Sequence, residues 1–561
     1  MKVRIFLLLL YTFIFLGISN SSFGKNINFN YDAKSISSYF SGLVSFDEYD
    51  YINSEKFFKK INNINYSTRY SSKYIQSLVN LERYNQAKLY SKRLDRKNLK
   101  NFEVNLFLGI SELKRNKFSK AYDYFSKLEP NFEHQMIFNI LKISLKNWME
   151  IADDKNGNGT EIIDKMLLRK SNFNEIQKIF ANCYFDNTKT MQVFNESISN
   201  KEYNLSRYRF FQSNYLANNK KISEAKNIIK LGSKENPSNL LINQFNKTLF
   251  NGEENKNDFS CKNIQHIVAE LLYVLANALS NQGNYKLSNF YINLSKYLNP
   301  KFLSYNSLLA ENFLMLGKYN KSREIYKKLS EVGSIYGWYS SRRIAIILTE
   351  EGKDKESINF LTKAYEKISP NHYQAFDFAN FLRSNEEFKK SIDLYSKILS
   401  EINKEHELYP KLLDRRGTAY ERTGNWALAE KDLILSLQIS PNEPYVMNYL
   451  AYSWIENGEN IEEALRMLRK ANDLKKNDGY ITDSLGWGLY KLNNFKDAKL
   501  YLEKAIVLMP TDPIVNDHFA DCLWKNNQKI QARYYWNYVL SLKTTDEKLK
   551  KTIKNKLLFG L

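Results

Sequence analysis

Histidine, cysteine, proline and glycine are scarce in this chain of 561 residues, which contains 5, 3, 9 and 20 of them. The shortage of histidine and cysteine argues against a zinc- or iron-dependent enzyme, because these side chains are the usual ligands of those metals. The shortage of glycine and proline excludes collagen-like and low-complexity chains. What remains is a sequence with long stretches that are free of helix breakers.

Two local matches to metal sites fail at an essential ligand. His406-Glu407 begins like the zinc motif H-E-x-x-H, but Pro410 stands where the second histidine is required. Residues 154–165 begin like a calcium-binding loop, yet Lys165 occupies the position that needs a bidentate acid. We interpret that stretch as an Asn/Gly-rich turn, and we expect no metal and no cofactor.

Catalytic motifs are missing as well. The chain has no G-x-S-x-G, no Walker loop and no G-x-G-x-x-G. His518 lies between Asp517 and Asp521, a grouping that would suit acid/base chemistry. The alternative, which we prefer, is that these residues line a surface or cap a helix. We therefore expect a protein that is not an enzyme.

Long hydrophobic runs are absent after the first 24 residues. Lys2 and Arg4 precede an apolar run from Ile5 to Ile18, and small residues around Phe23 offer a cleavage site, as in a secretory signal peptide. The run has about 14 residues, whereas a membrane span needs about 20. We expect a signal peptide over residues 1–24 and a periplasmic protein without a transmembrane segment. The alternative is an uncleaved anchor in the inner membrane.

The three cysteines, Cys183, Cys261 and Cys522, are far apart in the sequence. An exported compartment permits disulfides, but an odd number of cysteines at these spacings suggests no disulfide framework. We expect all three to be small buried side chains in helices.

Negative charge is in short supply, since 61 Asp and Glu stand against 82 Lys and Arg and leave a net charge of +21. Such an excess would suit nucleic acid, anionic lipid or an acidic polysaccharide. The lysines are spread along the chain, however, and the abundance of Asn, Ile and Tyr indicates a composition bias. The densest cluster runs from Lys543 to Lys556. We expect no nucleic-acid partner, and we keep a polyanion or membrane-surface binder as the alternative function.

What the chain does contain is a repeat. Residues 410–544 comprise four pairs of amphipathic helices at a spacing of 34 or 35 residues, which is the period of a helical hairpin repeat. Small residues recur in them at fixed places: Gly417, Ala451, Gly486 and Ala520 in the first helices, and Ala429, Ala464, Ala498 and Ala532 in the second. Two helices that cross at close range cannot fit a large side chain at the contact.

This pattern resembles the tetratricopeptide repeat (TPR). In the best-matching hairpin the family's Gly, Tyr, Gly, Tyr, Ala, Phe and Pro correspond to Gly417, Tyr420, Gly424, Trp426, Ala429, Leu433 and Pro441. The resemblance implies an all-α fold, a right-handed solenoid of antiparallel helix hairpins. The stretch YVMNYLAYSWIENG is also similar to long exported TPR proteins of alphaproteobacterial type, and that resemblance implies a periplasmic adaptor in envelope assembly.

The strength of the repeat divides the chain after the leader. Residues 25–130 hold three weaker hairpins, and residues 131–268 keep helical periodicity but lose most of the pattern. Residues 269–544 hold about eight regular repeats, and residues 545–561 are predicted to be a polar capping helix. The polar loop 251–262 is the best candidate for a boundary. A compact domain without repeats inside 131–268 would favour a hidden enzyme instead.

The candidate site is the concave surface of the array. In TPR proteins four positions of the first helix face that surface; in this chain they are Tyr445, Asn448, Tyr452 and Ile455, then Tyr480, Asp483, Trp487 and Tyr490, then Ile514, Asp517, Asp521 and Trp524. Aromatic side chains supply contact area, and polar groups set the register of a ligand. We expect an interaction scaffold that binds an extended peptide or a partner helix there. The alternative is that several of these aromatics only pack between repeats.

Overall fold

The computed structural model describes residues 33–61, 68–129, 135–153, 171–200 and 202–561. The regular elements in these ranges are helices. One isolated antiparallel β-bridge pairs Asn257 with Phe302. By their contacts the helices divide into two compact units, residues 1–347 and 348–561. The predicted all-α fold of antiparallel hairpins is confirmed. The predicted signal peptide and the calcium-like stretch 154–165 lie outside the described residues.

Unit 1 consists of helix hairpins from α2 to α18 and most of α19. The bounds of its helices are α2 (Ala33–Asp47), α3 (Tyr51–Phe58), α4 (Thr68–Asn80), α5 (Tyr84–Arg96), α6 (Phe102–Leu113), α7 (Phe118–Ser126), α8 (Gln135–Asp153), α10 (Asn172–Tyr184), α11 (Thr190–Ser199), α12 (Tyr208–Asn218), α13 (Ile222–Glu235), α14 (Leu240–Asn251), α15 (Ile264–Asn281), α16 (Tyr285–Leu298), α17 (Tyr305–Met315), α18 (Tyr319–Leu329) and α19 (Ser334–Glu350). A short 3-10 turn, Ser330–Val332, joins α18 to α19. The described part of 131–268 is therefore helical.

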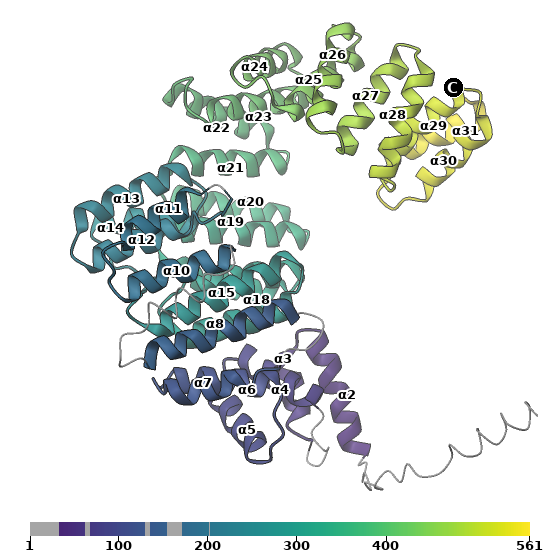
Figure 1. Cartoon of the computed structure of the whole chain (residues 1–561). Helices are drawn as coiled ribbons and strands as arrows, with labels where there is room; N and C mark the ends of the chain where they lie inside the picture. Colours follow the sequence, from purple (N-terminus) through teal and green to yellow (C-terminus); the bar gives the residue numbers. More distant parts are fainter. Residues whose placement is uncertain (1–32, 62–67, 130–134, 154–170, 201) are drawn as a thin grey trace, which may run out of the picture. The chain divides into compact units, whose positions relative to one another are not determined.

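The first hairpins of unit 1 fold back on a later one. Helix α4 packs against α16. Helix α8 packs against α15 (Figure 1). The Tyr84 hydroxyl donates a hydrogen bond to the backbone oxygen of Asn293 at 3.0 Å, and Lys114 Nζ donates to that of Leu298 at 2.8 Å. These contacts join residues that are 209 and 184 positions apart. A solenoid in which every repeat touches only its neighbours would have none of them.

The polar loop between α14 and α15 belongs to unit 1. Its Phe259 is only 3% exposed, and its Asn257 Oδ1 accepts a hydrogen bond from the backbone nitrogen of Ser304 at 2.9 Å. The division of the chain into two units falls between Ile347 and Leu348, inside α19. The loop is thus a packed connection within one unit.

Unit 2 begins in the last residues of α19 and continues as hairpins to α31. The bounds are α20 (Asp354–Glu366), α21 (His372–Ser384), α22 (Phe388–Glu401), α23 (Tyr409–Arg422), α24 (Trp426–Ile439), α25 (Pro444–Asn457), α26 (Ile461–Leu474), α27 (Gly479–Lys491), α28 (Phe495–Leu508), α29 (Pro513–Lys525), α30 (Lys529–Ser541) and α31 (Glu547–Phe559). From α21 to α30 the helices pack in consecutive pairs.

Helix ends in unit 2 follow local signals in the sequence. Asp512 caps α29, because its Oδ1 accepts hydrogen bonds from the backbone nitrogens of Ile514 and Val515 at 2.9 and 3.1 Å. Pro513 follows at the first helical position, where its missing N–H costs nothing. At the other end of a helix, Gly458 adopts φ +75° and stops α25.

The small residues of the repeat lie where the two helices of a hairpin cross, as predicted. A Cβ on Gly417 would lie 3.0 Å from Leu433 Cγ and 3.1 Å from the backbone oxygen of Ala429. On Gly486 it would lie 2.7 Å from Leu502 Cγ. The alanines at the equivalent positions are completely buried: Ala429, Ala451, Ala464, Ala498, Ala520 and Ala532.

We expect Gly417→Leu to lower the free energy of unfolding by about 1–3 kcal/mol, because the added side chain overpacks the α23–α24 crossing. Urea unfolding followed by circular dichroism would measure the change. Lys431→Leu, at an exposed position of α24, is the matched control and should change stability little. Equal transition midpoints for the two variants would show that the crossing tolerates a leucine.

Candidate partner-binding surface

The twelve predicted groove residues lie on the first helices α25, α27 and α29, and only one per helix is well exposed. These three residues are Tyr445, Tyr480 and Ile514, with 54%, 60% and 45% of their surface accessible. They occupy equivalent positions in three consecutive repeats. We call them the exposed row.

The exposed tyrosine of α25 is held in place by the next repeat. Tyr445 Oη donates a hydrogen bond to Asp478 Oδ2 at 2.9 Å, and Lys475 Nζ lies 5.1 Å above the Tyr445 ring. Asp478 also caps α27, since its Oδ1 accepts from the backbone nitrogen of Ile481 at 3.2 Å. The ring is thus presented to solvent in a defined orientation, which lowers the entropy lost when it binds.

The remaining residues of α25 are covered to different degrees. Ile455 is buried, and Asn448 and Tyr452 are partly buried. Burial raises the pKa of Tyr452, with Glu456 and Asp483 adding to the effect, so its hydroxyl stays protonated. Asn448 Oδ1 is buried without a hydrogen-bond partner among the described residues. An unsatisfied buried acceptor of this kind costs stability.

Aromatic rings of α27 and α29 form a stack. The Trp487 ring lies 3.9 Å from the His518 ring at 12° and 4.7 Å from the Tyr490 ring at 8°, measured between centroids and planes. Trp487 Nε1 donates to Glu456 Oε1 at 2.6 Å. Through these contacts Trp487 connects three successive first helices, α25, α27 and α29. Because it is only 9% exposed, it has little surface left for a ligand.

The three groove carboxylates are buried and already paired. Asp483 Oδ2 lies 2.9 Å from His518 Nδ1. Lys556, on α31, places its Nζ 2.7 Å from Asp517 Oδ1 and 2.8 Å from Asp521 Oδ1. These pairings join α27 to α29 and α29 to α31.

Trp524, the last predicted groove residue, also contributes to packing. Its ring centroid lies 5.3 Å from that of Trp536, whose Nε1 donates to Asp521 Oδ1 at 3.0 Å. Burial and the neighbouring Asp517 raise the pKa of Asp521 to about 6, although Lys556 opposes the shift. Lys556 and Trp536 were not recognised from the sequence, because 35 and 15 residues separate them from Asp521 and no repeat position marks them.

We expect the stability of unit 2 to fall as the pH rises through the native pKa of His518. Burial lowers that pKa, but Asp483, Asp517 and Asp521 raise it more, so the net shift is upward from 6.5. A raised pKa in the native state means that the stabilisation is complete below pH 6.5 and is lost at higher pH. Urea unfolding of the wild type and of His518→Asn between pH 6 and pH 8.5 would test this. The variant should lose the pH dependence, and an identical slope in both proteins would contradict the assignment.

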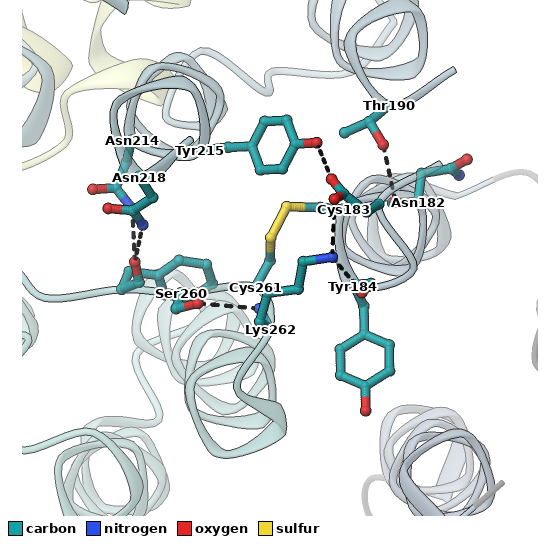
Figure 2. The surroundings of a disulfide bond; sticks show 12 residues. Asn182, Cys183, Tyr184, Thr190, Asn214, Tyr215, Asn218, Ser260, Cys261 and Lys262 are labelled. Carbon is teal, nitrogen blue, oxygen red and sulfur yellow. Dashed lines mark hydrogen bonds and ion pairs between the residues drawn. A yellow bond between two sulfur atoms is a disulfide. The ribbon is translucent and has the colours of Figure 1, made fainter. Parts of the chain in front are cut away.

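A disulfide bond joins Cys183 to Cys261, which corrects the expectation that all three cysteines are unpaired (Figure 2). The fold brings the end of α10 against the loop before α15, so the two Cα atoms are 5.9 Å apart although 78 positions separate them. That approach is long-range and could not be read from the spacing. Cys522 is buried and free, as predicted.

Polar contacts surround this disulfide on both sides. Lys262 Nζ donates to the backbone oxygen of Tyr184 at 3.0 Å, and Tyr215 Oη donates to Asp186 Oδ1 at 2.5 Å (Figure 2). On the other side, Asn214 Nδ2 donates to the backbone oxygen of Phe259 at 2.7 Å. Hydrogen bonds therefore hold the α14–α15 loop in place around the disulfide, and the disulfide links this loop covalently to α10.

Comparison with known families identifies the repeat. Residues 319–545 match the family described as tetratricopeptide repeat. This stretch is a TPR array. A TPR repeat-containing protein of Pseudomonas aeruginosa is 32% identical over 101 residues, which is 18% of this chain and 17% of that relative. The match thus spans about a sixth of the relative's length.

Several solved structures align with this chain at low sequence identity and with TM-scores below 0.5. The Cut9–Hcn1 hetero-tetramer of the APC/C is 14% identical, with a TM-score of 0.38, over 94% of this chain and 97% of that one. Yeast Tom70 is 14% identical, with a TM-score of 0.37, over 93% of this chain and 94% of that one. A TPR protein from Parabacteroides merdae is 15% identical, with a TM-score of 0.34, over 51% and 97%.

Proposed function

We propose that the protein is a non-catalytic interaction scaffold whose TPR array binds an extended peptide or a partner helix. The observation that carries the proposal is the exposed row, Tyr445, Tyr480 and Ile514, at one position of three consecutive repeats. Apolar and aromatic side chains repeated at a fixed structural interval match a ligand that is itself regular, such as a strand or a helix. Asn448, three positions after Tyr445 on α25 and partly buried, is the polar side chain that we expect to set the ligand's register.

We propose further that the protein acts in the periplasm and takes part in envelope assembly. The predicted signal peptide is one support. The other is the disulfide between Cys183 and Cys261, because disulfides persist in oxidising compartments and are rare in the cytosol. In the described part of the chain, no helix has the length and apolarity needed to cross a membrane. The alternative is that residues 1–24 are not cleaved and anchor the protein in the inner membrane.

The test is in vivo crosslinking in the envelope with Tyr445→Ala and Tyr480→Ala combined. Both side chains are exposed, so the fold should survive, and each truncation at a contact of this kind costs about 1–2 kcal/mol of binding. We expect the crosslinked partners of the wild type to be lost from the double variant. Quantitative mass spectrometry of the captured proteins is the measurement.

The matched control replaces exposed apolar residues on second helices of the same array. Leu428→Ala and Leu500→Ala remove side chains that are 46% and 65% exposed on α24 and α28. This control should keep every partner. If the Tyr445/Tyr480 variant keeps all partners while the Leu428/Leu500 variant loses them, binding uses the second helices and the assignment to the exposed row is wrong.

A further inference from the structure

The end of unit 2 presents large apolar side chains to solvent at one place. These are Ile530, Leu558, Phe559 and Leu561, which are 84%, 71%, 84% and 45% exposed. The start of α30 and the end of α31 meet there, because Arg533 donates a hydrogen bond to the backbone oxygen of Leu557. Trp524 lies between the same segments, with Arg533 over its ring and Gly560 against its edge. We call this apolar group the α30–α31 tip.

The tip is surrounded by positive charge. From Cys522 to Leu561 the chain has nine lysines and arginines and only two acids, Asp546 and Glu547. Seven of the nine are exposed: Lys525, Lys529, Arg533, Lys543, Lys548, Lys551 and Lys554. Both acids lie at the start of α31, at the far end of that helix from the tip, together with Lys543 and Lys548. The exposed cations on the side of the tip are therefore Lys525, Lys529, Arg533, Lys551 and Lys554.

Helix α31 directs its apolar and basic residues outward together. Lys551 and Lys554 precede Leu558 by seven and four positions, so the three side chains share one helix face. The opposite face is used for packing, since Ile553 is completely buried and Lys556 is held by Asp517 and Asp521. Helix α31 is thus held in place by its packed face, while the side chains of the tip stay exposed.

Three kinds of partner would meet this surface differently. A second copy of the same tip would bring like charges together, which is unfavourable. A nucleic acid would pair with the lysines, but it would leave Ile530 and Leu558 without a stacking partner, because base stacking requires aromatic or planar side chains. An anionic lipid surface satisfies both features, since its headgroups attract lysines and its acyl region accepts bulky apolar side chains.

We propose that the α30–α31 tip docks peripherally on an anionic phospholipid surface, with Leu558 and Phe559 entering the headgroup–acyl boundary. This role adds a membrane contact to the scaffold and does not depend on the exposed row. It places the excess positive charge of this end of the chain against the opposite charge of the lipid. Docking would hold this end of the TPR array beside the membrane.

The experiment is flotation of the full-length protein with vesicles of phosphatidylcholine alone and of phosphatidylcholine containing phosphatidylglycerol. We expect binding to the anionic vesicles only, and weaker binding as salt is raised. Replacing Leu558 and Phe559 with serine, or Lys551 and Lys554 with glutamate, should lower the affinity at least about tenfold. In Phe559→Trp, insertion should shift the fluorescence of the new indole to shorter wavelength, against the wild type's seven tryptophans as background.

Matched controls separate docking from general stickiness and charge. Leu500→Ser with Val507→Ser removes exposed apolar side chains of α28, and Lys476→Glu with Lys496→Glu reverses two exposed lysines elsewhere in unit 2. Both pairs should bind as the wild type does. Failure to float with anionic vesicles would overturn the proposal. So would binding to a DNA duplex that the Leu558/Phe559 variant retains in full, because the lysines would then serve nucleic acid.

Discussion

Arg207→Met is expected to lower the free energy of unfolding by about 3–5 kcal/mol, because it leaves the Glu270 carboxylate charged and buried without its partner. Glu270 is completely buried, and Arg207 Nε and Nη2 donate to its two oxygens at 2.8 and 3.2 Å. Tyr305 Oη adds a third hydrogen bond at 3.2 Å. Glu270 also raises the pKa of Arg207 against the effect of burial, so the guanidinium remains charged.

The measurement is urea unfolding of the full chain, followed by circular dichroism. The double variant Arg207→Met with Glu270→Leu should recover most of the loss, since no charge is then stranded. The surface pair Arg466–Glu463, whose side chains are 79% and 42% exposed, provides the control. Arg466→Met should cost no more than about 1 kcal/mol. A loss for Arg207→Met as small as that of the control would show that water reaches Glu270.

Removing the disulfide with Cys183→Ser and Cys261→Ser is expected to cost about 2–4 kcal/mol, because the bond closes a long loop in the unfolded chain. The bond spans 78 positions and ties α10 to the loop before α15. Reduction of the wild type should produce the same loss. Unfolding in urea with and without reductant, for wild type and double variant, would measure both effects.

The double variant itself is the internal control for this experiment, since reductant should leave its midpoint unchanged. Cys522 is buried and unpaired, so it should not account for any response of the wild type. A wild type whose stability is indifferent to reductant would mean that the two cysteines stay reduced in the folded protein. That outcome would also remove one of the two supports for an exported protein.

The candidate site was only partly predictable, and the repeat explains why. Its period assigned Tyr445, Tyr480 and Asp517 to one side of the first helices, since that assignment depends only on position within a hairpin. Whether each side chain is free depends on what else reaches it. Asp517 forms an ion pair with Lys556 of α31, and the His518 ring stacks on Trp487. Tyr445 and Tyr480, in contrast, remain exposed.

The sequence by itself determined the helix hairpins and their crossings, because these depend on contacts between residues fewer than about 20 positions apart that recur with each repeat. Gly417 against Leu433 is such a contact. Only the tertiary structure decided the bond between Cys183 and Cys261, the return of the first hairpins onto α16, and the pairing of Lys556 with Asp517. Those contacts are long-range and occur once, and a periodic pattern carries no information about an event that does not repeat.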